Sequence, residues 1–165
     1  MSVSGGNAIN HGVAYAGMMT TVFQLRNGVS KLNKGTVNIP FGTGVVTDGD
    51  DGAKVPVAAS TAANFVGVVK RELNRAYTAT DIVGAAAKFD MTVITTGEVW
   101  VTAFVAVTKD QPVYLIVGDG TGTNQGKFTN VVGAAGTLAV LIPNAKWTSS
   151  AGAGALAKIS LNIGG

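Results

Sequence analysis

The sequence contains no cysteine and only one histidine, His11, among its 165 residues. Disulfide bonds and thiolate zinc sites are therefore excluded, and a single imidazole cannot form a multi-histidine metal site. Charged residues make up 13% of the chain, whereas typical soluble domains contain about 25%. Aromatic residues make up only 7%. The core must therefore be built mostly from valine, isoleucine, leucine and alanine.

Neither basic residues nor apolar residues form long runs. The net charge is +3, but Lys70 and Arg71 are the only adjacent basic residues, so a nucleic-acid-binding stripe is not supported. Residues 128–145 are uncharged, but glycine, asparagine and proline interrupt them, and a transmembrane helix needs roughly 20 apolar residues. The N-terminus also lacks the basic and apolar segments of a secretory signal. We expect neither direct nucleic-acid contact nor a membrane partner.

The residues that are abundant favour strands. Glycine, alanine, valine and threonine make up more than half of the chain; valine and threonine favour pleated strands, and 23 glycines argue against long helices. Short apolar runs separated by turn residues cover 65–69, 91–95, 98–103, 112–117 and 138–142, with Gly97 marking a tight turn or bulge between two of them. This spacing predicts an all-β fold, a compact antiparallel β-sandwich or barrel, with a jelly roll as one option.

The clearest strand lies at the C-terminus, in residues 155–163. Apolar and polar residues alternate there: Ala157, Ile159, Leu161 and Ile163 on one face, and Lys158, Ser160 and Asn162 on the other. Such alternation is typical of an antiparallel strand with one buried face and one face in water. Ile159 and Leu161 are therefore predicted to lie in the core.

The chain divides by charge into two parts. Arg26 is the first charged residue, and the stretch before it shows neither helical nor strand periodicity. We expect residues 1–30 to form an extended N-terminal arm that orders against a partner, and residues 31–165 to form the β-rich body. A frayed terminus is the alternative interpretation of the arm.

A search for chemistry finds no catalytic, cofactor-binding or metal site. The glycines of residues 118–122 follow a predicted strand but open no helix, as a dinucleotide turn requires. The acidic turn 48–52 lacks the spaced ligands of a calcium loop. With one histidine and two glutamates, the usual acid–base and nucleophile constellations are absent, so we expect no enzyme. Trp100 and Trp147 either line a ligand groove or anchor the core or an interface.

Several short motifs follow one another in the C-terminal half. They are Gly97-Glu98-Val99-Trp100-Val101, Gln111-Pro112-Val113-Tyr114, Gly126-Lys127-Phe128-Thr129-Asn130, Ala145-Lys146-Trp147-Thr148 and Gly154-Ala155-Leu156-Ala157-Lys158-Ile159-Ser160-Leu161-Asn162. In this order, and with the upstream run 65–69, the chain resembles the structural cement, or head decoration, proteins of tailed bacteriophages. The resemblance covers roughly residues 35–163 and leaves the first 30 residues unmatched.

The resemblance implies a non-enzymatic structural protein of the virion. Such a protein is made in the host bacterial cytoplasm, binds the outer surface of the capsid and bridges major capsid subunits to stabilise the head. It also implies self-association, with a homotrimer favoured over a dimer, and no cofactor. The alternative is a carbohydrate- or receptor-binding β-module of a phage tail or cell surface, which exposed aromatic side chains in one groove would favour.

Overall fold

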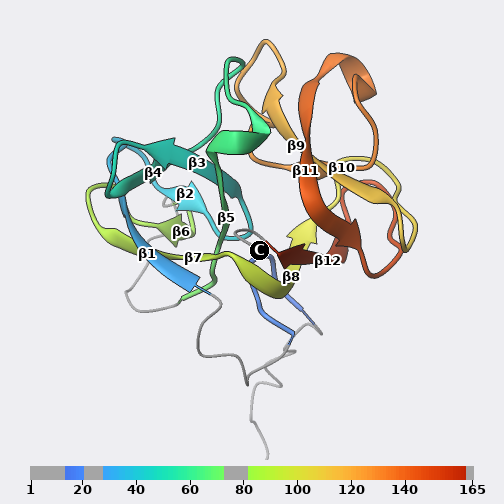
Figure 1. The fold of residues 1–165 in the computed structure, drawn as a ribbon, viewed down its shortest axis with the longest axis horizontal. Helices are drawn as coiled ribbons and strands as arrows, with labels where there is room; N and C mark the ends of the chain where they lie inside the picture. The colour runs from blue at the N-terminus through green and yellow to red at the C-terminus, as the bar shows by residue number, and fades with distance from the viewer. Residues whose placement is uncertain (1–13, 21–27, 73–81, 163–165) are drawn as a thin grey trace, which may run out of the picture.

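The computed structural model describes residues 14–20, 28–72 and 82–162. These residues form β-strands and two 3₁₀ turns but no α-helix, which confirms the predicted all-β fold (Figure 1). The strands are Gly28–Asn33 (β1), Ile39–Pro40 (β2), Gly44–Asp48 (β3), Gly52–Lys54 (β4), Phe65–Val69 (β5), Gly84–Ala85 (β6), Asp90–Ile94 (β7), Thr96–Thr102 (β8), Pro112–Gly118 (β9), Phe128–Thr129 (β10), Leu138–Trp147 (β11) and Leu156–Asn162 (β12). The turns are Ala62–Asn64 (η1) and Ala134–Gly136 (η2).

Five strands close into a barrel in the order β1-β4-β3-β5-β7. The pairs are antiparallel except β1 with β4, which run parallel. Closure removes the free strand edges that would otherwise pair with another chain. The short strands β2 and β6 form an antiparallel pair of their own, with Ile39 opposite Ala85.

The second sheet has five antiparallel strands in the order β10-β9-β11-β12-β8. It lies beside the barrel, and the chain passes from one to the other between β7 and β8 (Figure 1). The predicted turn near Gly97 is therefore not a hairpin. β7 pairs with β1 and β5, whereas β8 pairs with β12.

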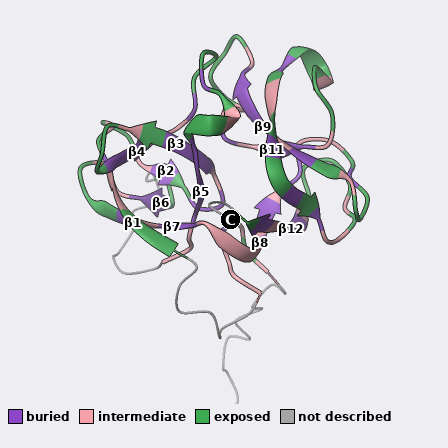
Figure 2. Cartoon of the chain, viewed as in Figure 1, coloured by how far each residue is buried: buried purple, intermediate pink, exposed green. Residues whose placement is uncertain are grey.

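The main core lies between the barrel and the second sheet. All five residues of β5 are buried, because this strand has the barrel interior on one side and the second sheet on the other. Phe65 and Val68 join the core shared with the second sheet, while Val66 and Val69 join the core of the barrel. Figure 2 shows β5 and β9 largely buried. This two-sided burial explains why the 65–69 run is continuously apolar.

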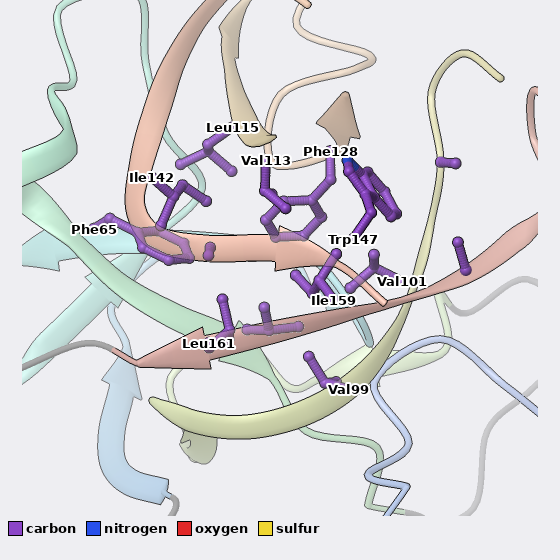
Figure 3. Close-up of a cluster of buried hydrophobic side chains, with 14 of the residues drawn as sticks. Phe65, Val99, Val101, Val113, Leu115, Phe128, Ile142, Trp147, Ile159 and Leu161 are labelled. Atoms are coloured by element: carbon purple, nitrogen blue, oxygen red, sulfur yellow. The ribbon is translucent and has the colours of Figure 1, made fainter. Parts of the chain in front are cut away.

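Aromatic residues from three strands meet in the shared core (Figure 3). The rings of Phe65 and Phe128 lie 6.5 Å apart and nearly perpendicular, in the edge-to-face arrangement that aromatic pairs prefer. Trp147 is fully buried beside them in the same core. Because the cluster draws on β3, β5 and β7 as well as β8–β12, the barrel and the second sheet share one core.

The predicted C-terminal strand is confirmed as β12. Ala157 and Ile159 are fully buried and Leu161 is 2% exposed, while Asn162 is exposed. Residue 163 lies outside the described residues. The buried face of β12 packs into the shared core, as the alternation predicted.

The arm and body boundary stays a prediction. Within the predicted arm, residues 1–13 and 21–27 lie outside the described residues, as does His11. The described residues 14–20 contact the body, and β1 begins at Gly28, also within the predicted arm.

Candidate docking surfaces

One group of exposed apolar side chains surrounds the β2–β6 pair. It consists of Val37, Ile82, Val83 and Phe89, and is called here the β2–β6 surface. Phe89 is 66% exposed and Val37 is 62% exposed. Large side chains left this open to water are unusual unless a partner covers them.

The buried amide of Asn33, the last residue of β1, holds this surface in place. Its Nδ2 donates hydrogen bonds to the carbonyl oxygens of Val37 (3.0 Å) and Ala85 (3.3 Å). Its Oδ1 accepts a hydrogen bond from the Gly35 N–H at 3.0 Å. The Asn33 backbone N–H donates to the Phe89 carbonyl at 3.0 Å. One residue that is 1% exposed therefore fixes the backbone beneath both Val37 and Phe89.

Asn38 and Lys88 complete this support. Asn38 Nδ2 donates to the Ile82 carbonyl at 3.0 Å, and its Oδ1 accepts from the Ala87 N–H at 3.1 Å. Lys88 has a φ of +64°, and its Nζ donates to the Lys34 carbonyl at 2.7 Å. This left-handed turn immediately precedes Phe89. The sequence analysis missed both asparagines, because a polar residue near a turn carries no signal of its distant partners.

A cavity of about 450 Å³ opens beside the same surface. Its lining combines apolar residues and charges: Phe41, Lys70, Glu72, Gly84, Ala85, Ala86, Phe89, Asp90, Met91 and Thr92. Lys70 Nζ lies 3.0 Å from a carboxylate oxygen of Glu72, and both side chains are partly exposed. The cavity therefore has an apolar interior and charges of both signs at its edge.

A second exposed apolar group lies in the other half of the molecule. Val131, Val132, Leu138 and Leu141, called here the β11 surface, are each between 48% and 58% exposed. They come from the loop before β11 and from β11 itself. No charged residue occurs from position 128 to position 145. The two adjacent valines were the sequence signal that could have indicated this surface.

Local hydrogen bonds shape the loop that carries these valines. Asn130 Nδ2 donates to the Ala106 carbonyl at 3.2 Å and to Gln111 Oε1 at 2.7 Å. Thr137 is buried, and its Oγ1 donates to the Ala134 carbonyl at 2.7 Å. These contacts hold both ends of the loop, so the valines between them are displayed on an ordered backbone.

The segment 14–20 connects the two halves. The Gly17 N–H donates to the Trp100 carbonyl in β8, and the Gly17 carbonyl accepts from the Arg71 N–H at 2.9 Å just beyond β5. The Trp100 N–H donates back to the Met18 carbonyl at 2.8 Å. A Cβ at Gly17 would lie 2.6 Å from the Val69 carbonyl oxygen, so only glycine fits this close approach.

Polar contacts hold the end of this segment against β8. Thr20 Oγ1 donates to a Glu98 carboxylate oxygen at 2.9 Å, and Lys158 Nζ lies 3.5 Å from the same oxygen. Burial alone would raise the pKa of Glu98, but these hydrogen bonds and the Lys158 ammonium outweigh it and lower the pKa. Lys158 also lies 5.9 Å from the centre of the Trp100 ring. Glu98 is thus held ionised as part of the junction.

The two tryptophans have different roles. Trp147 is fully buried and belongs to the core, as one of the two interpretations predicted. Trp100 is half-buried, and its backbone pairs with the segment 14–20. They form no shared groove, since Trp147 is not accessible.

The two loops that were tested for ligand motifs have structural roles. Residues 48–52 connect β3 to β4. Asp119 accepts hydrogen bonds from the backbone N–H groups of Thr121, Gly122 and Asn124, which folds the 118–126 loop upon itself. Over the described ranges, no three histidine, aspartate or glutamate side chains gather in a group that could hold a metal ion. No helix in the same part of the chain is long and apolar enough to cross a membrane.

Comparisons with known proteins identify the family. The family model described as "Structural cement protein (E217 gp24/Pam3 gp6)" matches residues 6–162. A chain in the solved structure titled "The capsid of Myoviridae Phage XM1" has a similar fold, with a TM-score of 0.62 and 22% sequence identity. That similarity covers 96% of this chain and 98% of the other. No curated protein matches the sequence.

The match spans nearly the whole chain and includes the motifs on which the resemblance rested. A cement protein is a structural component of the virion, so the expected non-enzymatic role and capsid location are confirmed. Binding to capsid proteins follows from the same assignment. This chain belongs to the family of phage structural cement proteins.

Proposed function

We propose that this protein binds the outer surface of the assembled capsid and bridges neighbouring major capsid subunits, which stabilises the head. Membership of the cement family supports a capsid partner. The single observation that carries the finer proposal is the pair of exposed apolar surfaces, one beside β2–β6 and one on β11, in a molecule with one shared core. A bridge needs two contact surfaces and a rigid connection between them.

The β2–β6 surface suits a different protein as its partner. Protein interfaces combine an apolar centre with a polar rim. Phe89 supplies an exposed aromatic anchor, and a cavity lies beside it. Lys88 and Asp90 flank Phe89, so a partner with complementary charges would be favoured over others. We assign this surface to the capsid contact.

The connection between the halves suits a load-bearing role. The core shared by the barrel and the second sheet would have to be exposed to water before the halves could separate. The segment 14–20 adds backbone hydrogen bonds to both sides of the junction. Force applied at one surface is therefore transmitted to the other.

Self-association completes the proposal, with a homotrimer favoured and a dimer as the other arrangement. The low charge content and the exposed apolar side chains support it. Copies that each hold one capsid subunit would join those subunits through their contact with one another.

Co-sedimentation with purified capsids that lack this protein tests the capsid contact. We expect wild-type protein to pellet with capsids, and Phe89→Ala to bind roughly tenfold more weakly or worse, as for loss of an aromatic anchor. Val29→Ala is the matched control, because Val29 is exposed in β1 outside both surfaces. Failure of the wild-type protein to pellet would refute capsid binding, and equal binding by both variants would refute the assigned surface.

No observation favours the carbohydrate- or receptor-binding alternative. It required exposed aromatic side chains in one groove, but Trp147 is buried and Trp100 lies under the segment 14–20. The capsid proposal uses Phe89 instead, in the setting of a protein interface.

A further inference from the structure

We infer that the β11 surface is where copies of this protein contact one another, with the partner being the β11 surface of a second copy. The inference rests on the proposed function for its biological setting, but its physical argument is independent of capsid binding. Val131, Val132, Leu138 and Leu141 are the side chains concerned.

The first argument is the absence of charge. The stretch from 128 to 145 contains no ionisable side chain, although Lys127 and Lys146 lie immediately outside it. A surface without charges requires a partner surface that also lacks them, because a buried unpaired charge is costly. The same surface on a second copy meets that requirement. When like surfaces meet, the apolar side chains are buried and no like charges are opposed.

The second argument is that the backbone beneath this surface is already paired. β11 lies inside its sheet, between β9 and β12. Ile142 is buried and Val140 packs against the core, whereas Leu141 between them is 48% exposed. Contact with another copy would therefore use side chains of the outer face and would not add a strand to the sheet. Such a contact can form between folded copies without any rearrangement of the core.

A third argument extends the surface to a neighbouring loop. At Gly118 a Cβ would meet both Ala58, 3.2 Å away, and Leu138, 3.5 Å away, so the loop before η1 lies against the start of β11. Val57 in that loop is also 47% exposed. The apolar area therefore includes side chains from two separate parts of the chain, as expected of an interface larger than one loop.

The β2–β6 surface is less suited to contact with itself. Lys88 and Asp90 flank Phe89, and the Lys34 side chain is exposed nearby. Where like surfaces meet around a symmetry axis, such groups approach their own copies and repel one another. The two surfaces thus divide the work: one binds the capsid, and the other joins copies.

Sedimentation velocity of the isolated protein at micromolar concentration tests the inference without capsids. We expect the wild-type protein to sediment as an oligomer and Leu141→Glu to associate roughly tenfold more weakly or worse, since it buries a charge at the contact. Val132→Glu provides a second variant, in case the first fails to fold. Circular dichroism and the melting temperature establish that each variant keeps the wild-type fold.

Val37→Glu is the matched control, because Val37 is equally exposed but lies on the β2–β6 surface. It should remain oligomeric while losing capsid binding. A monomeric wild-type protein, or a folded Leu141→Glu variant that stays oligomeric, would overturn the inference. If no variant affects capsid binding but Leu141→Glu still dissociates, the self-contact stands and the capsid proposal falls.

Cross-linking gives a direct second test, because the chain has no native cysteine. A bis-maleimide reagent should join copies of Leu141→Cys into covalent dimers on a denaturing gel. Val29→Cys, exposed in β1, should remain monomeric under the same conditions. Equal cross-linking of the two variants would mean random collision and would contradict a specific contact at β11.

Discussion

The guanidinium of Arg71 lies 4.3 Å from the centre of the Tyr15 ring, which holds the N-terminal segment 14–20 against the residue that follows β5 by two. The Arg71 backbone N–H also donates to the Gly17 carbonyl at 2.9 Å. A second ring, that of Phe41, lies 5.9 Å from the same guanidinium. Arg71 thus joins the segment, the barrel and the β2–β3 connection.

Replacing Arg71 by alanine should lower the free energy of unfolding by about 1 kcal/mol, the usual range for a partly exposed cation–π contact. Its backbone hydrogen bond to Gly17 would remain, so the effect isolates the side chain. Lys70→Ala is the control, because it removes only an exposed ion pair with Glu72 and should cost less than about 0.5 kcal/mol. Urea denaturation measures both; equal losses would show that the ring contacts contribute nothing.

Removal of residues 1–20 should destabilise the protein more than removal of residues 1–13. The longer deletion eliminates the backbone hydrogen bonds between the segment and Trp100 and Arg71, and it exposes the outer edge of β8. We expect a lower melting temperature with the β-sheet circular dichroism signal retained. Identical melting temperatures for the two deletions would mean that the segment adds no stability to the body.

Asn33→Ala should cost about 2–3 kcal/mol, because it leaves buried backbone groups without their partners. Asn38→Ala should cost less, since Asn38 is partly exposed and water can replace its bonds. The Asn33 variant should also bind capsids more weakly, because the backbone beneath Val37 and Phe89 loses its support. Denaturation and co-sedimentation test the two parts. A loss of stability with unchanged capsid binding would separate Asn33 from the docking surface.

Leu161→Ala should cost about 2–5 kcal/mol, the range for emptying a packed core site. Asn162→Ala, one residue further along β12, should change stability by less than about 0.5 kcal/mol, because its side chain is exposed. Chemical denaturation gives both values. Similar costs at the two positions would contradict the assignment of one buried and one exposed face.

Asp119 predicts a specific response to acid. Burial alone would raise its pKa, but hydrogen bonds from the Asn124, Gly122 and Thr121 backbone N–H groups and from the Thr121 hydroxyl lower it to about 2 from 3.8. A lowered pKa in the folded state means that the ionised carboxylate stabilises the loop above pH 3.8, and that this stabilisation is lost as the pH falls to about 2. The stability difference between wild-type protein and Asp119→Asn should shrink over that interval. A difference independent of pH would refute this role of the carboxylate.

The sequence by itself determined which residues form strands and which faces of the clearest strands are buried. Alternation in residues 155–163 indicated β12 and its buried Leu161, and the continuous apolar run 65–69 indicated a strand buried on both sides. These properties are local, because a side-chain period of two and the transfer of apolar groups from water act on neighbouring residues. The motif order also carried the family, which the match over residues 6–162 confirms.

Only the tertiary structure decided which strands pair and where the docking surfaces lie. Nothing local distinguishes β7 joining a barrel with β1 and β5 from β7 forming a hairpin with β8. The support of Phe89 by Asn33 and the hold of Arg71 on Tyr15 join residues more than fifty positions apart. Such contacts depend on how the whole chain closes its core, because an amide or a guanidinium can satisfy its hydrogen bonds in many places and the packing of distant strands selects one of them.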